Sequence, residues 1–294
     1  MYTNIYKSLE NTLSFATVLK IKLLEDDDIK VCNYLSQNIP NIDYDFNPGK
    51  EISEKELINQ SFKNFKKFDK SNYLRLKNIF NNVQIEHIDE PHFFAVQTQF
   101  KRNIYDNIKQ DSGRIRHYEI PNRNYEIDII SLGHEHCHAL KDSNYLEHQY
   151  IYVLGETIPI FYELINYEHN FLKQQNLIQR FKGLNQDINI FLEASQLLNQ
   201  PNNNQYNISY YFTDKQIYNF ARSYSGVYLN SFYYAIILYN MYKKNPTKIL
   251  KSISSVLKQE ITTYEMLNKL NIYLDIQGET FEKEISNIKK ILTK

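Results

Sequence analysis

The chain lacks the features that usually mark nucleic-acid-binding, membrane-spanning or disulfide-stabilised proteins. Its 294 residues carry 34 basic and 34 acidic side chains, so the formal net charge is zero. Nothing therefore points to nucleic acid or to an anionic membrane as a partner. No stretch approaches the ~20 apolar residues of a membrane span. Residues 1–24 also lack the basic start and long apolar run of a signal peptide.

Cysteine and tryptophan are also scarce. The two cysteines, Cys32 and Cys137, do not form a Cys-x-x-Cys pair, so we expect a reducing compartment and no disulfide framework. Tryptophan is absent, whereas tyrosine occurs 25 times, in a globular composition of 42% hydrophobic and 23% charged residues. The expected protein is soluble and cytoplasmic.

Apolar spacing and helix-capping residues predict a mainly helical chain. Residues 53–56 have the Ser-x-x-Glu pattern of a capping box, and Pro159 suits the first turn of a helix. Pro and Gly between residues 38 and 50 indicate a linker between an N-terminal helical segment, 1–45, and the main domain, 46–294. We expect helices over residues 5–24, 28–37, 53–68, 69–82, 124–141, 157–198 with a break, 213–244, 247–258, 262–270 and 279–293.

The middle of the chain changes character and predicts a small sheet. Residues 92–100 are rich in strand-forming side chains. In residues 114–120 the side-chain type alternates along the chain, and Gly113 and Pro121 flank this segment. We interpret the two segments as an antiparallel sheet that precedes the helix over 124–141.

That helix carries the pattern His-Glu-x-x-His at His134, Glu135 and His138. Positions i and i+4 lie on one helix face, so both imidazoles can bind one ion. Zinc suits two neutral imidazoles, and a third protein ligand would leave one position for a water molecule. Glu135 can take a proton from that water as it attacks a carbonyl. The alternative is a His-rich surface helix, but apolar flanks favour a buried site that needs a compensating partner.

A third ligand must come from another element, and two glutamates on the next predicted helix qualify. Glu156 and Glu163 are seven residues apart, so they lie two turns apart on the same helix face. One can bind the metal while the other orients a ligand histidine. Solvated carboxylates are the alternative, although the neighbours of both glutamates are apolar.

These two segments resemble the thimet oligopeptidase and oligoendopeptidase F family of zinc peptidases, which is of the gluzincin type. That family carries His-Glu-x-Gly-His-Ala, then Glu-x-x-Ser/Pro-x-x-x-Glu on the following helix. Residues 134–139 and 156–163 look like these motifs, and a weaker likeness covers roughly residues 45–292. The resemblance implies that the main domain is a mainly α, zincin-like catalytic domain, with a small antiparallel sheet before the metal-binding helix.

The chain departs from the family pattern at several positions. Cys137 replaces the family glycine, and Lys141 replaces a histidine three residues beyond the motif. Glu163 has the family's usual separation from the second histidine, whereas Glu156 lies seven residues nearer. We assign Glu156 as the third ligand, because the glutamate pair and Pro159 match as a unit and a connecting loop easily loses seven residues. Glu163 is then the residue that orients a ligand, or the alternative third ligand.

Two tyrosines complete the expected site. Tyr224 and Tyr228 look like the family's Gly-Tyr-x-x-x-Tyr segment, whose tyrosines stabilise negative charge on the carbonyl oxygen. They are four residues apart and share a helix face. With so many tyrosines in the chain, core or surface filler is the alternative. Asn219 stands where the family has a histidine.

The resemblance therefore implies a zinc-dependent peptidase that cleaves extended peptides, with zinc as cofactor and peptide as partner. His134, His138 and Glu156 would bind the zinc, and Glu135 would act as general base. Two rivals stay open: a catalytically impaired, metal-containing peptide-binding protein of the same fold, and a zinc hydrolase that acts on another substrate. Neither nucleic acid nor a membrane is expected as a partner, and the oligomeric state is left open.

Overall fold

The computed structural model describes residues 24, 26–39, 46–89, 95–99, 114–141, 154–167, 173–199 and 214–272, with a few further positions between 282 and 290. This part is mainly helical with a minor β component, as the sequence predicts. Its elements are α3 (Asp26–Asn38), β1 (Glu51–Ile52), α4 (Glu54–Phe68), α5 (Tyr73–Asn81), β2 (Gln84–Ile88), β3 (Ala95–Gln99), β4 (Arg114–Pro121), β5 (Asn124–Tyr125), α6 (Asp128–Lys141), α8 (Thr157–Tyr167), α9 (Lys173–Leu198), α10 (Asp214–Lys244), α11 (Pro246–Leu257) and α12 (Thr263–Lys269). The helix expected over 5–24 lies outside the described residues, apart from Leu24, and the one over 279–293 lies largely outside them.

Several helices begin at capping residues, as α4, α11 and α12 show. Ser53 Oγ accepts a hydrogen bond from the backbone N–H of Glu56 at 3.2 Å and starts α4. The break expected within 157–198 falls between α8 and α9. The helix expected from residue 124 begins instead at Asp128, because Asn124 and Tyr125 pair with β1. The Asp128 carboxylate then accepts from the Tyr125 N–H at 2.7 Å.

The β component differs from the expected antiparallel sheet. β3 and β4 do pair antiparallel, within the two segments that the sequence identifies as strands. However, β2 pairs parallel with the other edge of β4, which makes the three-stranded sheet mixed, in the order β2-β4-β3. The prediction of a purely antiparallel sheet is therefore wrong for β2. Both edges of β4 carry backbone N–H and C=O groups that need hydrogen-bond partners. β3 pairs with one edge, and β2, which follows α5, pairs with the other.

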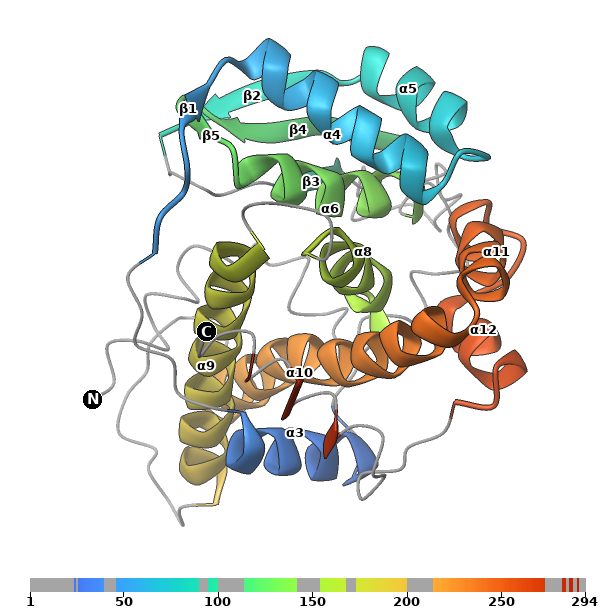
Figure 1. The fold of residues 1–294 in the computed structure, drawn as a ribbon. Helices are drawn as coiled ribbons and strands as arrows, with labels where there is room; N and C mark the ends of the chain where they lie inside the picture. Colours follow the sequence, from blue (N-terminus) through green and yellow to red (C-terminus); the bar gives the residue numbers. More distant parts are fainter. Residues whose placement is uncertain are drawn as a thin grey trace, which may run out of the picture.

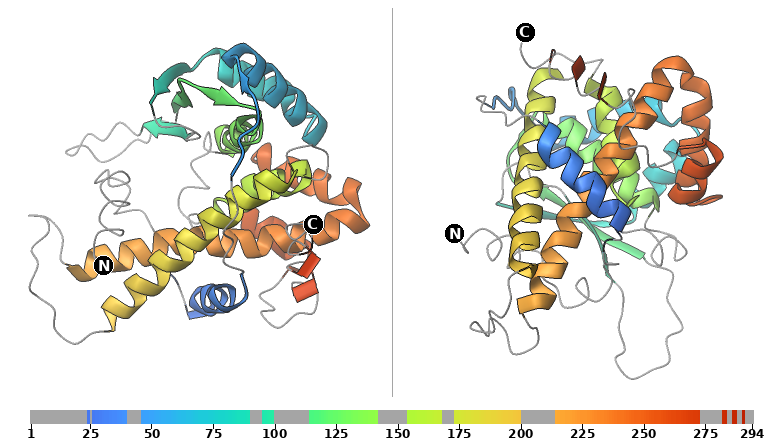
Figure 2. Two further views of the ribbon diagram at one scale, coloured as in Figure 1. Left: turned by 60° about the vertical axis from the view of Figure 1, so that its left-hand side comes forward. Right: turned by 90° about the horizontal axis from the view of Figure 1, so that it is seen from below.

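The helix α6 lies inside the molecule, between two layers. Towards the top of Figure 1 it packs against α4 and α5 and lies close to the sheets, and below it packs against α8. α10 then lies against α8, α9 and α3, and crosses α9 at an angle that is clear in Figure 2. Because α6 has packed elements on both sides, most of its side chains are buried.

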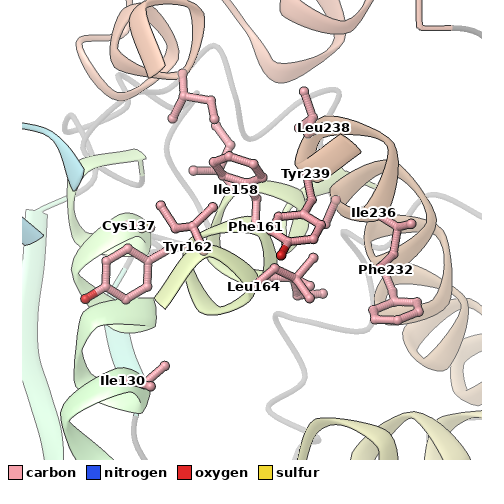
Figure 3. Packing of buried hydrophobic residues seen from close by; sticks show 14 of the residues in the cluster. Ile130, Cys137, Ile158, Phe161, Tyr162, Leu164, Phe232, Ile236, Leu238 and Tyr239 are labelled. Carbon is pink, nitrogen blue, oxygen red and sulfur yellow. The ribbon is translucent and has the colours of Figure 1, made fainter. Parts of the chain in front are cut away.

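The contact between α6 and α8 is close enough to exclude a side chain at one position. A Cβ atom at Gly133 would collide with the ring of Tyr162 on α8. Figure 3 shows that ring beside α6, with Ile130 and Cys137, and shows Phe161 facing the side chains of α10. Tyr162 and Phe161 are fully buried, and burial of such a side chain contributes about 1.5–3 kcal/mol. This packing fixes α8 beside the histidine motif.

The N-terminal helix belongs to the same core. Val31, Cys32 and Leu35 of α3 are fully buried in one cluster with residues of α8, α9 and α10. The expected domain boundary after residue 45 adjoins residues 40–45, which lie outside the described part. Among the helices of the described ranges, none is long and apolar enough to cross a membrane.

Candidate metal centre

Three side chains from two elements converge on one point. His134 and His138 lie one turn apart on α6, and Glu156 immediately precedes α8. The Nε2 atoms of the two histidines are 3.1 Å apart. The Oε2 atom of Glu156 lies 3.0 Å from His134 Nε2 and 3.2 Å from His138 Nε2. In the described part of the chain these three residues form the one group with the geometry to hold a metal ion.

The spacing of these three atoms suits a single small divalent ion. In a tetrahedral site with metal–ligand distances of about 2.0–2.1 Å, neighbouring ligand atoms are about 3.3 Å apart. The three separations fall within a few tenths of an ångström of that value. Two imidazoles and a carboxylate suit zinc, and also iron, cobalt or nickel. The cluster can therefore hold a metal ion.

Glu163 occupies an outer position in this site. Its Oε1 atom lies 2.6 Å from Nδ1 of His134, on the far side of the imidazole from Glu156. This bond places the proton on Nδ1 and leaves the lone pair of Nε2 free for a metal. Arg180 of α9 holds the carboxylate in turn, with Nε donating to Oε2 at 2.7 Å and Nη2 donating to Oε1. Glu163 thus contacts the outer nitrogen of His134, whereas Glu156 belongs to the group of three that could hold a metal ion.

The two carboxylates make a positive charge favourable in the cluster. Burial alone would lower the pKa of His134, but its hydrogen bonds to the carboxylates of Glu156 and Glu163 outweigh burial and raise the pKa to about 10. Burial likewise disfavours the ionised form of Glu163, yet Arg180 and His134 hold its pKa at about 2. The carboxylates are therefore anionic, and without a metal the imidazoles bind protons in its place.

Glu135 lies beside the cluster without joining it. Its Oε1 atom is 3.9 Å from His134 Nε2, and its side chain is partly exposed. The side chain leaves the helix about 100° away from that of His134. It is therefore close to the cluster but is not one of its three members.

The two tyrosines expected in the site, Tyr224 and Tyr228, lie on α10, within electrostatic range of Glu156. Their hydroxyl oxygens are 3.4 Å apart. Burial raises the pKa of Tyr224 to about 12, and the carboxylates of Glu156, Asp187 and Glu135 act in the same direction. Burial, and then Glu156, also raise the pKa of Tyr228 well above its ordinary value. Both hydroxyls therefore stay protonated and can donate hydrogen bonds near the cluster.

The other residues of the motif have structural roles. His136 lies on the opposite face of α6, where its ring stacks on Phe62 at 4.7 Å between centroids. Its Nε2 lies 3.1 Å from Ser61 Oγ, and its Nδ1 lies 3.2 Å from the Tyr118 hydroxyl. Burial lowers its pKa to about 3, so it is a neutral core histidine. The thiol of Cys137 contacts the Gly133 carbonyl at 3.6 Å.

Three neighbours of the site were not identified from the sequence as its parts. Arg180 binds Glu163, and Asp187 lies within electrostatic range of Arg180 and Glu156. Their seven-residue spacing on α9 puts both on one face, but no motif connects either to the histidines. Lys141, noted in the sequence only as a departure from the family, donates from Nζ to the Gly155 carbonyl at 2.7 Å.

No family model, curated protein or solved structure matches the chain.

Proposed function

We propose that the chain is a zinc-dependent metallopeptidase that hydrolyses peptide bonds of extended peptides. One observation carries the proposal: the ligand atoms of His134, His138 and Glu156 lie within 3.2 Å of one another. Glu135 stands beside them as a carboxylate that is not a ligand. A site that only stored a metal would have no need of this fourth group.

The donor set favours zinc among the divalent metals, because two imidazoles and one carboxylate are a usual catalytic set for that ion. Bound there, zinc would polarise a carbonyl and lower the pKa of a water molecule. Glu135 would take the proton from the attacking water and pass it to the leaving amine. Glu163 would hold the imidazole of His134 in place during the proton transfers by Glu135.

The tyrosine hydroxyls would act on the substrate. As water adds to a peptide carbonyl, negative charge develops on its oxygen, and a preformed donor lowers the barrier. Tyr224 and Tyr228 are protonated and lie within electrostatic range of Glu156. We assign them as donors to that oxygen.

Two features support the family that the motifs resemble. The chain has a small sheet before α6, as the zincin-like domain of that family is expected to have, although β2 is parallel in it. The helix after α6 carries Glu163, and Glu156 directly precedes it, in the order of the family motif. We therefore propose a zincin-like, gluzincin-type catalytic domain related to the thimet oligopeptidase and oligoendopeptidase F family.

One observation favours the rival, a metal-containing peptide-binding protein without activity. Asn219 stands where the family has a histidine, and its Oδ1 accepts from Nη2 of Arg222, one turn along α10, at 3.2 Å. An amide in that place cannot exchange protons as an imidazole can.

Cleavage of a quenched fluorescent peptide library separates these functions. We expect turnover by the zinc-loaded protein, loss with a chelator and recovery when zinc is restored. Glu135→Gln is the matched control, because it keeps the size of the side chain but cannot accept a proton. A protein that binds zinc and peptides yet cleaves no library member is the binding protein instead.

A further inference from the structure

Lys141 lies on the metal-binding face of α6. It follows His134 by seven residues and His138 by three, so all three side chains project from one face of the helix. The residue is only 2% exposed. Its Nζ atom donates to the carbonyl oxygen of Gly155 at 2.7 Å. Gly155 directly precedes Glu156, so this bond joins the helix of two ligands to the peptide unit that carries the third.

Burial of this ammonium group works against folding. A charged group loses its hydration when buried, and methionine would fill a similar space without that cost. A residue kept only for packing would therefore be apolar. The hydrogen bond gives the ammonium a use that packing does not require, because it fixes a specific backbone oxygen beside a ligand.

We propose that Lys141 is a positioning residue for the metal site. By holding the Gly155 carbonyl it fixes the turn at residues 154–156 relative to α6, and so sets the place of the Glu156 carboxylate. Nothing else in the mechanism depends on Lys141, which does not touch the reacting atoms. The inference rests on the metal centre, which the proposed function shares, and it does not depend on peptide cleavage.

The chain offers a matched control at the same end of α6. Arg75 is also a partly buried cation that donates to backbone carbonyls, to Leu257 O at 2.7 Å and to Leu140 O at 3.2 Å. These two bonds join α5 to α11 and α6, and neither involves Gly155. Gln259 Nε2 also donates to Leu140 O, at 2.9 Å, so that carbonyl keeps a partner when Arg75 is changed.

The test compares Lys141→Met with Arg75→Met. Metal-free protein of each variant is titrated with zinc against a chromophoric chelator, and thermal unfolding of the metal-free form is recorded. We expect Lys141→Met to bind zinc about 10- to 100-fold more weakly, the usual effect of changing a residue that supports a ligand. Its metal-free form should be at least as stable as wild type. Arg75→Met should be less stable but keep wild-type affinity.

The visible absorption spectrum of the cobalt-substituted protein adds a measurement that a loss of stability alone would not change. With cobalt in place of zinc, a displaced Glu156 changes the ligand field, so the visible absorption bands of Lys141→Met should differ from wild type and from Arg75→Met. Lys141→Gln, whose side chain is one bond shorter, serves the same comparison if Lys141→Met does not fold. Wild-type affinity and spectrum in the lysine variant would overturn the inference. So would equal losses of affinity in both variants. Neither result would bear on peptide cleavage, which is assayed separately.

Discussion

The division of work between Glu156 and Glu163 can be tested by changing each in turn. Glu156 Oε2 lies 3.0 and 3.2 Å from the two imidazole Nε2 atoms. Glu163 Oε1 instead lies 2.6 Å from Nδ1 of His134, and Arg180 binds the same carboxylate. Glu156→Ala therefore removes a proposed ligand. Glu163→Gln removes only the negative charge beside Nδ1 of His134.

The expected losses of metal affinity differ in size. Zinc binds a four-ligand structural site with about 10–16 kcal/mol, or roughly 3 kcal/mol per ligand. At 1.4 kcal/mol per tenfold change, Glu156→Ala should weaken binding by at least about 100-fold. Glu163→Gln keeps an oxygen that can accept from Nδ1, so its loss should be about 10- to 100-fold.

The effects on stability run in the opposite order. Glu163→Gln takes the carboxylate from Arg180, and breaking a buried ion pair costs up to about 3–5 kcal/mol. The double variant with Arg180→Met removes that charge as well, so it should recover part of the loss. Glu156→Ala also removes contacts to His134 and His138, but these imidazoles can lose their protons, which Arg180 cannot, so the cost should be smaller.

Competition with a chelator gives the affinities, and unfolding of the metal-free proteins gives the stabilities, at a temperature where every variant is folded. If Glu163→Gln loses the metal while Glu156→Ala keeps it, the assignment of the third ligand is wrong.

Four further outcomes are expected. Elemental analysis of protein purified without added metal should find one zinc per chain; none, or two, contradicts a single site. Glu135→Gln should keep the zinc but cleave peptide about 10²–10⁴-fold more slowly, and cleavage at the wild-type rate would exclude Glu135 as the base. Gly133→Ala should lower the free energy of unfolding by about 1–3 kcal/mol, because the new methyl group meets Tyr162; unchanged denaturant unfolding would refute that contact. The pKa of Glu163 is about 2, below the value of about 4.3 for a glutamate in an unfolded chain. The stabilisation of the fold by ionised Glu163 is therefore fully present above about pH 4.3 and is lost as the pH falls towards 2. Metal-free Glu163→Gln should therefore lose less stability than wild type over that range, as a pH series of melting curves would reveal.

The centre of the site was predictable because its residues are close in sequence. The spacing of His134 and His138 fixes a shared helix face without any knowledge of the fold. Glu156 directly precedes the next helix and Glu163 lies on it, and Pro159 near its start indicates where that helix begins. The choice of Glu156 over Glu163 depended on their seven-residue spacing and on the family motif, and Glu156 is the glutamate in the group that could hold a metal ion.

The remainder depended on contacts between distant segments. Arg180 reaches Glu163 from another helix, and nothing in the sequence around it differs from an ordinary surface arginine. Gly155 meets Lys141 only because two elements pack together. β2 has few strong strand formers, and pairs with β4 because that strand has a second free edge. Such pairings are fixed by the tertiary fold, which local propensity cannot determine.

Helix geometry and the internal place of α6 together explain the roles of neighbouring residues in the motif. His134 and His138 face α8 and the third ligand, whereas His136, about 200° round the helix from His134, faces α4 and β4. Both faces are buried, so each histidine needs a polar partner. On one face the partners are the carboxylates of Glu156 and Glu163, and on the other they are Ser61 and Tyr118. A metal held by His134, His138 and Glu156 would therefore join α6 to the start of α8. Because only the folded chain brings these ligands together, the metal should stabilise the contact between the sheet-bearing layer and the helical layer by an amount that grows with the logarithm of its affinity.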